Sequence, residues 1–398
     1  MIPYKLSLIA DIVGGELIGN DNIIDNVFID SRNALANNSL FFAIVGKRHD
    51  GHKYLIDLYK LGIKAFVVSK LPEDYKQYPY NSYIVVDNTL LALQQLAAYH
   101  LQQFNIPVSV ITGSNGKTTV KEWIAQLILH SDVKLVRSPK SYNSQVGVPL
   151  SVLLTEPNDE VAVFEVGISE QGEMEKLEKI IHPKACTLST EIGILTNIGE
   201  AHQENFLDIS NKLDEKLKLF VHSDVLIYCS DSELINRKIK SQYDKLTLFT
   251  WGKQGNPSLR IVKIEHNFGK TDIKLSYKNA EFSVNIPFTD SASIENAMHS
   301  ISALLVLGYS PAFIAERTPL LTPLAMRLEV KEGVNNCIII HDSYNSDINS
   351  LTIALDFLSS FSQNANNTHI LSDIQQSGKD DVALFSDVAK LIHHKKIT

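Results

Sequence analysis

The sequence predicts an α/β protein whose central element is a phosphate-binding loop. Its 398 residues exceed the length of one typical domain, so two or three domains are expected. Short β-branched apolar runs alternate with helical periods along most of the chain, a pattern typical of mostly parallel sheets. One such run, residues 108–112, leads into a glycine turn and a helix whose first residues are a lysine and two threonines.

Composition narrows the class of protein. The apolar share of 44% is ample for buried cores, and the net charge of −8 argues against nonspecific binding to nucleic acid. No charged-then-apolar leader follows Met1, and no apolar run approaches the ~20 residues of a membrane span. Cys186, Cys229 and Cys337 have no metal-like spacing. A cytoplasmic protein without membrane insertion is therefore expected.

Residues 1–88 are expected to form a small α/β domain. Helical periods cover residues 6–12 and 54–61, and apolar runs at 40–45 and 64–68 predict strands. The order strand, helix, strand predicts that the two strands are parallel.

Two polar clusters interrupt this first domain, one before the strand at 40–45 and one, residues 46–52, directly after it. Loops at the carboxyl ends of parallel strands are where such sheets bind ligands, so the second cluster is a candidate contact for an anion or a sugar nucleotide. A solvated polar loop explains the same spacing equally well. The candidate side chains of the two clusters are Asp30, Ser31, Arg32, Arg48 and His52.

A helix predicted over residues 89–104 leads to the phosphate-binding loop. Two glycines allow a sharp turn that brings backbone N–H groups close to an anion, and the helix N-terminus adds a partial positive charge. Lys117 would reach the β- and γ-phosphates, and a hydroxyl of Thr118 or Thr119 would complete a Mg²⁺ shell. Two residues separate the glycines where the usual P-loop has four, and an ordinary glycine turn is the alternative. The loop residues are Gly113, Ser114, Asn115, Gly116, Lys117, Thr118 and Thr119.

Two further predicted strands end near Glu165 and His202. Residues 161–167 form an apolar run with Glu165 near its carboxyl end, and a buried lone carboxylate costs several kcal/mol. A divalent cation beside the phosphates would pair this carboxylate, whereas an edge-strand glutamate facing water is the alternative. The strand at 192–197 ends shortly before His202. His202 is a candidate site residue only if the carboxyl ends of these strands carry the nucleotide.

The helix predicted over residues 208–220 is rich in lysine. A solvated helix face explains Lys212 and Lys218, and the same helix carries Lys216. The next expected elements are a strand at 224–229, a β-rich stretch from 246 to 287, a helix at 292–308 that contains Asn296, and a helix at 311–317.

A third domain is expected from about residue 320. Its expected elements are a strand at 337–341, a polar segment at 342–347, a helix to about residue 360, a strand at 368–371 and a helix at 382–393. This alternation predicts an open parallel sheet. So few elements do not close a stable doubly wound sheet, and the domain therefore looks cut short.

Together these motifs resemble the Mur ligase family, the ATP-dependent amide-forming enzymes of peptidoglycan precursor synthesis. The resemblance covers nearly the whole chain. Its most specific parts are the segments 112–119, 143–149 and 165–167, Thr196-Asn197 with His202, Asn296, Arg327, and Asp342-Ser-Tyr-Asn345. It implies three domains: a small α/β UDP-sugar-binding domain at 1–88, a central P-loop ATPase domain with a mostly parallel sheet at 89–319, and an incomplete Rossmann-like domain at 320–398.

The resemblance also implies roles for the matching residues. The triphosphate of ATP would be held by Gly113 through Thr119, adenine would contact Asn296, and ATP would be reached from the third domain by Arg327, Asp342 and Asn345. The Mg²⁺ ligands would be Thr118, Glu165 and His202. Lys216 matches the lysine that several family members carry as a carbamate bridging magnesium. The catalytic residues would then be Lys117, Glu165, His202 and Lys216, and the substrate contacts Asp30, Ser31, Arg32, Arg48, His52 and Asn143.

Within the family, the segment 342–345 and the polar clusters of the first domain resemble the branch that joins D-alanyl-D-alanine to UDP-N-acetylmuramoyl-tripeptide. The γ-phosphoryl group of ATP would convert the tripeptide carboxylate into an acyl phosphate, which the dipeptide amine attacks. Two other functions stay open. One is a ligase of the same fold that adds a single amino acid to a muramyl or folate-like acceptor, and the other is a nucleotide-binding regulator without ligase activity.

Three features depart from the family pattern. Ala292-Ser293 replaces a His-Asn pair ahead of the adenine-binding asparagine, which weakens the expectation for Asn296. Leu371-Ser-Asp-Ile374 replaces a Gly-Asp strand end. The chain also stops several tens of residues before the usual end of the family. The ligase part of a fusion to an alanine racemase would explain this, as would a fragment made for another reason.

Overall fold

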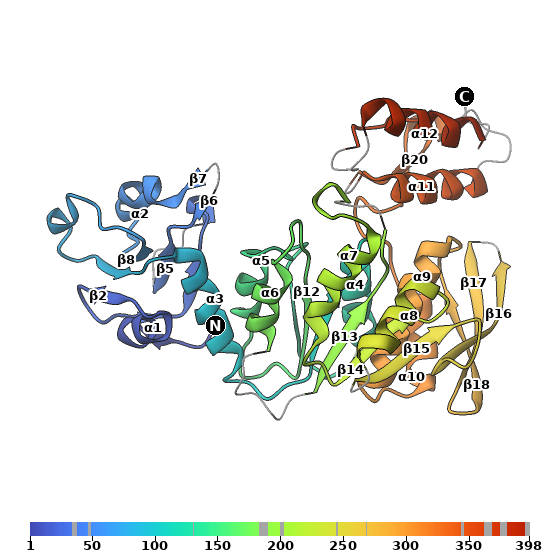
Figure 1. Cartoon of the computed structure of the whole chain (residues 1–398), viewed down its shortest axis with the longest axis horizontal. Coiled ribbons are helices and arrows are strands. Elements are labelled where there is room, and N and C mark those ends of the chain that lie inside the picture. Colours follow the sequence, from blue (N-terminus) through green and yellow to red (C-terminus); the bar gives the residue numbers. More distant parts are fainter. Residues whose placement is uncertain are drawn as a thin grey trace. The chain divides into compact units, whose positions relative to one another are not determined.

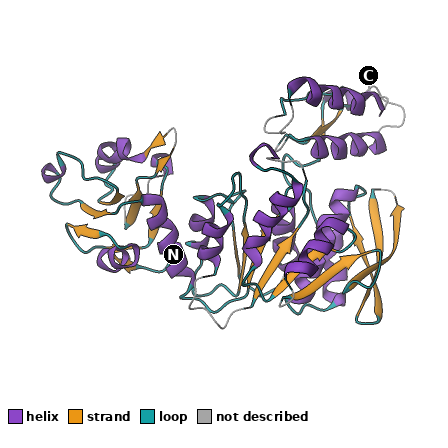
Figure 2. Ribbon diagram, viewed as in Figure 1, coloured by secondary structure: helices purple, strands orange, loops and turns teal. Residues whose placement is uncertain are grey.

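The computed structural model of the chain divides into two compact units. Unit 1 comprises residues 1–108, 134–166 and 175–189, and unit 2 comprises residues 109–133, 167–174 and 190–398. The structure describes residues 1–33, 38–46, 49–129, 131–182, 190–199, 203–243, 246–267, 269–343, 346–361, 368–374 and 380–394. Figure 1 colours the elements along the chain and Figure 2 colours them by type.

The described strands at the beginning of unit 1 form a five-stranded sheet in the order β2-β9-β8-β5-β4. β4, β5, β8 and β9 run parallel, as the strand–helix–strand pattern predicted, and β2 is antiparallel to β9. The strands span Glu16–Ile18 (β2), Asn26–Phe28 (β4), Ser39–Phe42 (β5), Ala65–Val68 (β8) and Ser82–Val85 (β9). Two short antiparallel pairs flank them, β1 (Tyr4–Lys5) with β3 (Ile23–Ile24) and β6 (Val45–Gly46) with β7 (His49–Asp50).

Aromatic and aliphatic side chains from the strands and from the helices form a hydrophobic core against this sheet. Phe41 and Phe66 are fully buried and pack with Phe28, Leu58 and Tyr83. The helices of this part of unit 1 span Leu6–Val13 (α1), Leu55–Lys60 (α2) and Thr89–Leu101 (α3). The predicted α/β elements at the beginning of the chain are therefore confirmed, with each helix within a few residues of its expected bounds, whereas the domain boundary at residue 88 stays a prediction.

Helix α3 is joined to later residues of unit 1 through buried polar side chains. His100 Nε2 donates to Thr155 O at 2.9 Å, so its Nδ1 accepts from Tyr4 Oη at 2.8 Å. Gln94 Nε2 donates to Gln145 O at 3.1 Å. The later elements of this unit are β11 (Leu135–Arg137), α5 (Gly147–Val152), β12 (Val161–Glu165), parallel to β11, and most of α6 (Met174–Ile181).

In unit 2, β10 and β13 to β18 lie in one sheet in the order β10-β13-β14-β15-β16-β17-β18. β13 to β16 run parallel, and β16, β17 and β18 form the antiparallel end drawn in yellow in Figure 1. The strands span Val108–Thr112 (β10), Glu191–Leu195 (β13), Val225–Cys229 (β14), Thr247–Gly252 (β15), Leu259–Asn267 (β16), Lys270–Tyr277 (β17) and Ala280–Ile286 (β18). The β-rich stretch predicted between residues 246 and 287 is thus confirmed.

Helices cover this sheet and position the loop after β10. Helix α4 (Lys117–Ile128) packs against α9 (Ser291–Val306), and α9 contacts β13, β14 and β15. Ile301 and Leu304 of α9 are fully buried, which explains the apolar period of this helix. The remaining helices of this part are α7 (Ile209–Leu217), α8 (Glu233–Gln242) and α10 (Pro311–Arg317).

The C-terminal part of unit 2 differs from the expected parallel sheet. β19 (Glu329–Glu332) pairs antiparallel with β20 (Ile338–His341), and α11 (Ile348–Phe361) and α12 (Asp381–His394) follow. Residues 368–371, predicted as a strand, are loop in the structure, and Ile370 is 99% exposed. A strand needs a neighbour for its backbone hydrogen bonds, and residues 368–371 pair with no described strand. Because the described pairing of β20 is antiparallel, the predicted parallel sheet is wrong among the described residues.

No helix in the described part of the chain is both long enough and apolar enough to cross a bilayer.

Candidate active site

The phosphate-binding loop lies between β10 and α4, where the sequence predicted it. All five residues of β10 are buried, and α4 begins at Lys117 with Gly116 as its N-terminal cap. Gly113 and Gly116 have φ values of 149° and 82°, which side chains rarely adopt. A Cβ atom on Gly113 would overlap Thr196 Oγ1, and one on Gly116 would overlap Asn296 Oδ1. Both glycines are therefore required by close approach as well as by backbone conformation.

Residues that follow β13 hold the loop in place. Asn197 O accepts from Ser114 N at 2.9 Å, and Asn197 Oδ1 accepts from Asn115 N at 2.9 Å. Thr196 Oγ1 donates to Asn115 O at 2.6 Å, and Gly199 N donates to Ser114 Oγ at 2.8 Å. Because two loop N–H groups bond to Asn197, the beginning of α4 remains the part of the loop where N–H groups and the helix dipole favour an anion.

Two lysine amines converge on the carbonyl of Gly113. Lys117 Nζ donates to Gly113 O at 3.0 Å and to Ser114 O at 2.9 Å, and Lys216 Nζ donates to Gly113 O at 3.1 Å. Lys216 is only 3% exposed. Burial, and then the nearby charges of Lys117 and Lys212, lower the pKa of Lys216 well below its usual range. The structure therefore brings Lys216 to the loop, as the resemblance implied.

The interpretation of Lys212 as part of a solvated helix face is wrong. Lys212 is 1% exposed, and its Nζ donates to Gly199 O at 2.5 Å beside the ring of Phe206. The side chain of Lys218 is 39% exposed and pairs with Glu215 at 2.9 Å, so it lies closer to solvent. The spacing of the lysines does not tell which of them are buried. Burial depends on which face of α7 packs against the residues after β13.

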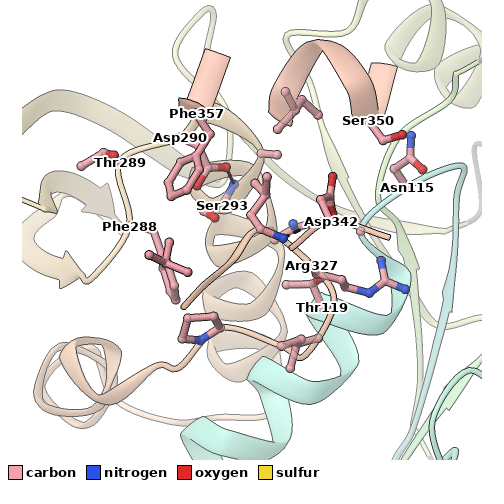
Figure 3. A pocket seen from close by; sticks show the side chains of 18 of the residues that line it. Asn115, Thr119, Phe288, Thr289, Asp290, Ser293, Arg327, Asp342, Ser350 and Phe357 are labelled. Carbon is pink, nitrogen blue, oxygen red and sulfur yellow. Dashed lines mark hydrogen bonds between the residues drawn. The ribbon is translucent and has the colours of Figure 1, made fainter. Parts of the chain in front are cut away.

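A cavity of ≈ 360 Å³ opens beside the loop within unit 2 (Figure 3). A volume of this size suits a small-molecule ligand. The rings of Trp123 and Phe288 are stacked at its wall, with centroids 4.8 Å apart. Of the residues predicted to contact ATP, the cavity is lined by Asn115, Gly116, Thr119, Asn296, Arg327 and Asp342. Asn345 lies outside the described residues.

Two charged side chains from after α10 reach this cavity. Arg327 Nη2 donates to Thr118 Oγ1 at 3.1 Å, which ties the start of α4 to a residue expected in the third domain. Asp342 Oδ1 accepts from Leu328 N at 3.3 Å. Burial raises the pKa of Asp342, although the Leu328 N–H and the Arg327 charge oppose this. The predicted approach of Arg327 and Asp342 to the phosphate loop thus has a structural basis.

Glu165 is buried in unit 1, at the end of β12. It is 1% exposed, so the alternative of an edge-strand glutamate facing water is excluded. Its Oε1 accepts from Asn143 Nδ2 at 2.7 Å, and its backbone N–H donates to Ser138 Oγ at 3.0 Å. Asn143, predicted as a substrate contact, is thus a direct partner of the Glu165 carboxylate.

Three of the residues predicted to bind the UDP-sugar, Asp30, Arg32 and His52, make hydrogen bonds within the first domain. Arg32 pairs with Asp30 at 2.6 Å and lowers the pKa of Asp30 to about 2. His52 Nδ1 bonds to Asp50 Oδ1 at 2.6 Å, and His52 Nε2 accepts from Ser69 N at 3.0 Å. His52 therefore shapes its loop with both ring nitrogens. Ser31 lies in the turn with Arg32, and Arg48 lies outside the described residues.

The predicted magnesium ligands come from separate parts of the chain. Thr118 belongs to unit 2 and Glu165 to unit 1, and His202 lies outside the described residues. In the described segments, no group of three or more His, Cys, Asp or Glu side chains could hold a metal ion. Mg²⁺ is usually bound through one or two carboxylates together with phosphates, so a hydroxyl and a single carboxylate are chemically suitable donors.

Three residues that support the loop carried no predicted role. Thr196 and Asn197 were recognised only as a motif, although polar residues directly after a buried strand are a signal for a site at the sheet edge. Glu295, which accepts from Asn197 Nδ2 at 3.0 Å, follows Ile294 in a helix with buried apolar neighbours. A carboxylate among apolar helix positions is a signal in the sequence for a residue with a polar partner.

Comparison with known proteins agrees with this geometry. The family profile described as "Mur ligase middle domain" matches residues 111–304, and "Mur ligase family, catalytic domain" matches residues 23–101. A relative in Borreliella burgdorferi, UDP-N-acetylmuramoyl-tripeptide--D-alanyl-D-alanine ligase, is 31% identical over 84% of this chain and 73% of its own length. The protein of the same name in Bacillus subtilis is 28% identical over 100% of this chain and 84% of its own length.

Solved structures show the same fold. MurF from Acinetobacter baumannii is similar with a TM-score of 0.85 and 23% identity, over 99% of this chain and 84% of that one. MurF ligase from Thermotoga maritima in complex with ADP is similar with a TM-score of 0.74 and 20% identity, over 92% of this chain and 82% of that one.

Proposed function

The chain belongs to the Mur ligase family, and we propose that it joins D-alanyl-D-alanine to UDP-N-acetylmuramoyl-tripeptide in peptidoglycan precursor synthesis, at the expense of ATP. One observation carries the proposal. The cavity beside the phosphate loop is lined together by residues of the loop, Asn296, Arg327 and Asp342, which the family resemblance assigns to ATP. The names of the relatives supply the acceptor and the dipeptide.

The reaction makes a carboxylate reactive before an amine attacks it. An oxygen of the tripeptide carboxylate attacks the γ-phosphorus of ATP, which releases ADP and forms an acyl phosphate. The amine of D-alanyl-D-alanine then attacks the acyl carbon, and the tetrahedral intermediate loses phosphate and a proton to leave the amide. Phosphoryl transfer depends mainly on positioning and on neutralising charge, so no covalent enzyme intermediate is needed.

Lys117 and Arg327 are the cations that would act on the phosphates. The Lys117 amine lies on the carbonyls of Gly113 and Ser114 and would turn to the β- and γ-phosphates when ATP binds. Arg327 lines the cavity and already contacts Thr118 at the start of α4, so it would neutralise charge on the phosphates there. Asn296 and Asn345 would contact the remaining parts of ATP.

Magnesium would be held by Thr118, Glu165 and His202. Support comes from the burial of Glu165, whose carboxylate is a hard oxygen donor of the kind that Mg²⁺ prefers. When bound, the ion would neutralise the phosphates and orient the γ-phosphoryl group. Asn143 would hold the Glu165 carboxylate in one orientation through its 2.7 Å hydrogen bond.

We propose that Lys216 is carbamylated in the active enzyme. Burial favours its neutral amine, which is the form that attacks carbon dioxide to give a carbamate and a proton. The product is an anion beside the phosphate loop, able to bind a magnesium ion. A plain lysine bonded to Gly113 O is the alternative, since the structure already gives the amine that partner.

The acceptor would bind to the first domain. Asp30, Ser31, Arg32 and Arg48 are its proposed contacts, with His52 acting through the loop that it shapes. The proposed domains are residues 1–88, 89–319 and 320–398, and the proposed location is the cytoplasm.

An assay of ADP release tests the substrates. UDP-N-acetylmuramoyl-tripeptide and D-alanyl-D-alanine are supplied singly and together, with single amino acids in place of the dipeptide as controls. The proposal expects ADP release only when acceptor and dipeptide are both present. Release driven by a single amino acid would favour the rival ligase, and ATP binding without any release would favour a nucleotide-binding regulator.

A further inference from the structure

Asn197 holds two successive N–H groups of the phosphate loop. Its backbone carbonyl accepts from Ser114 N, and its side-chain Oδ1 accepts from Asn115 N, each at 2.9 Å. The other end of the same side chain, Nδ2, donates to Glu295 Oε1 at 3.0 Å. A single amide thus connects a carboxylate on α9 with the backbone of the loop.

The orientation of that amide decides whether the loop is held. A primary amide has an acceptor end and a donor end, and a half-turn of the side chain exchanges them. In the observed orientation the oxygen of Asn197 faces the N–H of Asn115. In the reversed orientation two donors would face each other, and the N–H of Asn115 would lose its partner.

Glu295 can select between the two orientations because an ionised carboxylate only accepts hydrogen bonds. It bonds to the NH₂ end of the amide and leaves the oxygen end for Asn115. We propose that Glu295 is a positioning residue, which orients the Asn197 amide and thereby holds the phosphate loop ready for nucleotide. The inference rests on the proposed function in one respect, that this loop binds the phosphates of ATP.

The location of Glu295 supports a specific role. Its neighbours along α9, Ile294, Ala297 and Met298, are buried and apolar. Burial raises the pKa of Glu295, and the hydrogen bond from Asn197 opposes this rise. Glu295 itself is half-buried, and it is not among the residues that line the cavity. It would therefore act on nucleotide through Asn197 and not by contact.

The test measures ADP binding to the full chain by calorimetry, without acceptor or dipeptide. Glu295→Ala should weaken ADP binding by about tenfold, as expected for the loss of a hydrogen bond to a charged group. Glu295→Gln keeps an accepting oxygen and should bind ADP within about threefold of the wild type. Glu295→Met, an unbranched apolar side chain of similar length, should behave like Glu295→Ala and replaces it if the alanine variant does not fold.

Glu191→Ala is the matched control. Glu191 is a buried carboxylate at the other end of β13, where it accepts from Ser223 Oγ at 2.7 Å. Its loss should lower the melting temperature while ADP affinity stays unchanged. A further check combines Glu295→Ala with Asn197→Ala, which should weaken binding no more than Asn197→Ala alone, because both changes break the same chain of contacts.

Three results would overturn the inference: wild-type ADP affinity in Glu295→Ala and Glu295→Met, an equal loss in Glu191→Ala, or a Glu295→Gln variant as weak as Glu295→Ala. The last result would show that an accepting oxygen is not what matters. A wild-type chain that binds no ADP would overturn the proposed function, and the inference with it. The two failures are distinguishable because the first group concerns variants and the second concerns the wild type.

Discussion

At the scale of single residues, the phosphate loop depends on positions where a side chain does not fit. Gly113 has a φ of 149°, and a Cβ atom there would overlap Thr196 Oγ1. The hydroxyl of Thr196 cannot simply move aside, because it donates to Asn115 O at 2.6 Å. The turn itself was predictable from the sequence. Thr196, which excludes a side chain at Gly113, directly follows β13 and is far from the loop in the sequence.

The first prediction is that Gly113→Ala strongly weakens ADP binding and lowers the free energy of unfolding by about 1–3 kcal/mol, the usual cost of backbone strain. The physical reason is the overlap with Thr196, which must shift and release Asn115. Calorimetry and chemical denaturation measure the two effects. Gly255→Ala is the control, since Gly255 has a φ of 70° with nothing within 4 Å of an added Cβ. It should lose stability but keep ADP affinity, and equal ADP affinity in both variants would contradict the account.

The second prediction separates the lysines of α7. Lys216→Ala should abolish ligation with partial rescue by short carboxylates, because Lys216 lies beside the loop and is the proposed carbamate. Lys212→Ala should lower the melting temperature, because a buried amine is bonded to Gly199 O. Lys218→Ala should change little. Ligation assays and thermal denaturation of the three variants decide this, and full activity of Lys216→Ala would rule out the proposed role.

At the scale of elements, the helices and strands that were predicted within the first 320 residues are present in the predicted order, because each has a clear apolar period and a nearby partner. β10 and α4 are an example, with a fully buried strand next to a helix that begins at the predicted lysine. The strand predicted over residues 368–371 shows the limit. Its apolar residues fit a strand, but Ile370 is 99% exposed and β20 bonds to β19. A strand also needs a partner strand and a face to bury, and the local pattern of apolar residues specifies neither.

The functional site was predictable to a similar degree. Loop chemistry and the family motifs predict Lys117, Asn296, Arg327 and Asp342, because their residue types and spacing carry the signal. The structure places the last three at one cavity, and their roles stay predictions. The network of Thr196, Asn197 and Glu295 was not identified, because its hydrogen bonds join α9, the end of β13 and the loop after β10. Such contacts depend on the packing of the sheet and its helices.

The third prediction concerns helix α3, which His100 joins to Tyr4 and Thr155. Burial lowers the pKa of His100 from 6.5 to about 4, so the folded state favours neutral imidazole. The neutral ring's contribution to the free energy of unfolding is fully present above pH 6.5. It is lost as the pH falls from 6.5 toward about 4, and the loss amounts to roughly 3 kcal/mol at most. Denaturation at several pH values should show a shallower acid loss in His100→Gln than in the wild type. Identical slopes would contradict this assignment.

At the scale of the whole molecule, the two units carry different parts of the chemistry. Unit 2 holds the phosphate loop, the cavity and the side chains of Arg327 and Asp342. Unit 1 holds the buried Glu165 with its partner Asn143, and the polar clusters proposed for the UDP-sugar. This division matches a ligase that must bring a nucleotide and a large acceptor to one place. In the proposed reaction, the nucleotide activates the acceptor as an acyl phosphate.

Oxygen-isotope transfer tests this claim most directly. UDP-N-acetylmuramoyl-tripeptide labelled with ¹⁸O in its terminal carboxylate is incubated with ATP, D-alanyl-D-alanine and the enzyme, and the released phosphate is analysed by mass spectrometry. The attacking carboxylate oxygen becomes the bridging oxygen of the acyl phosphate and leaves with phosphorus when the amide forms. The account predicts one ¹⁸O atom in each phosphate released, together with one amide product. Unlabelled phosphate, as direct hydrolysis of ATP by water would give, would contradict it.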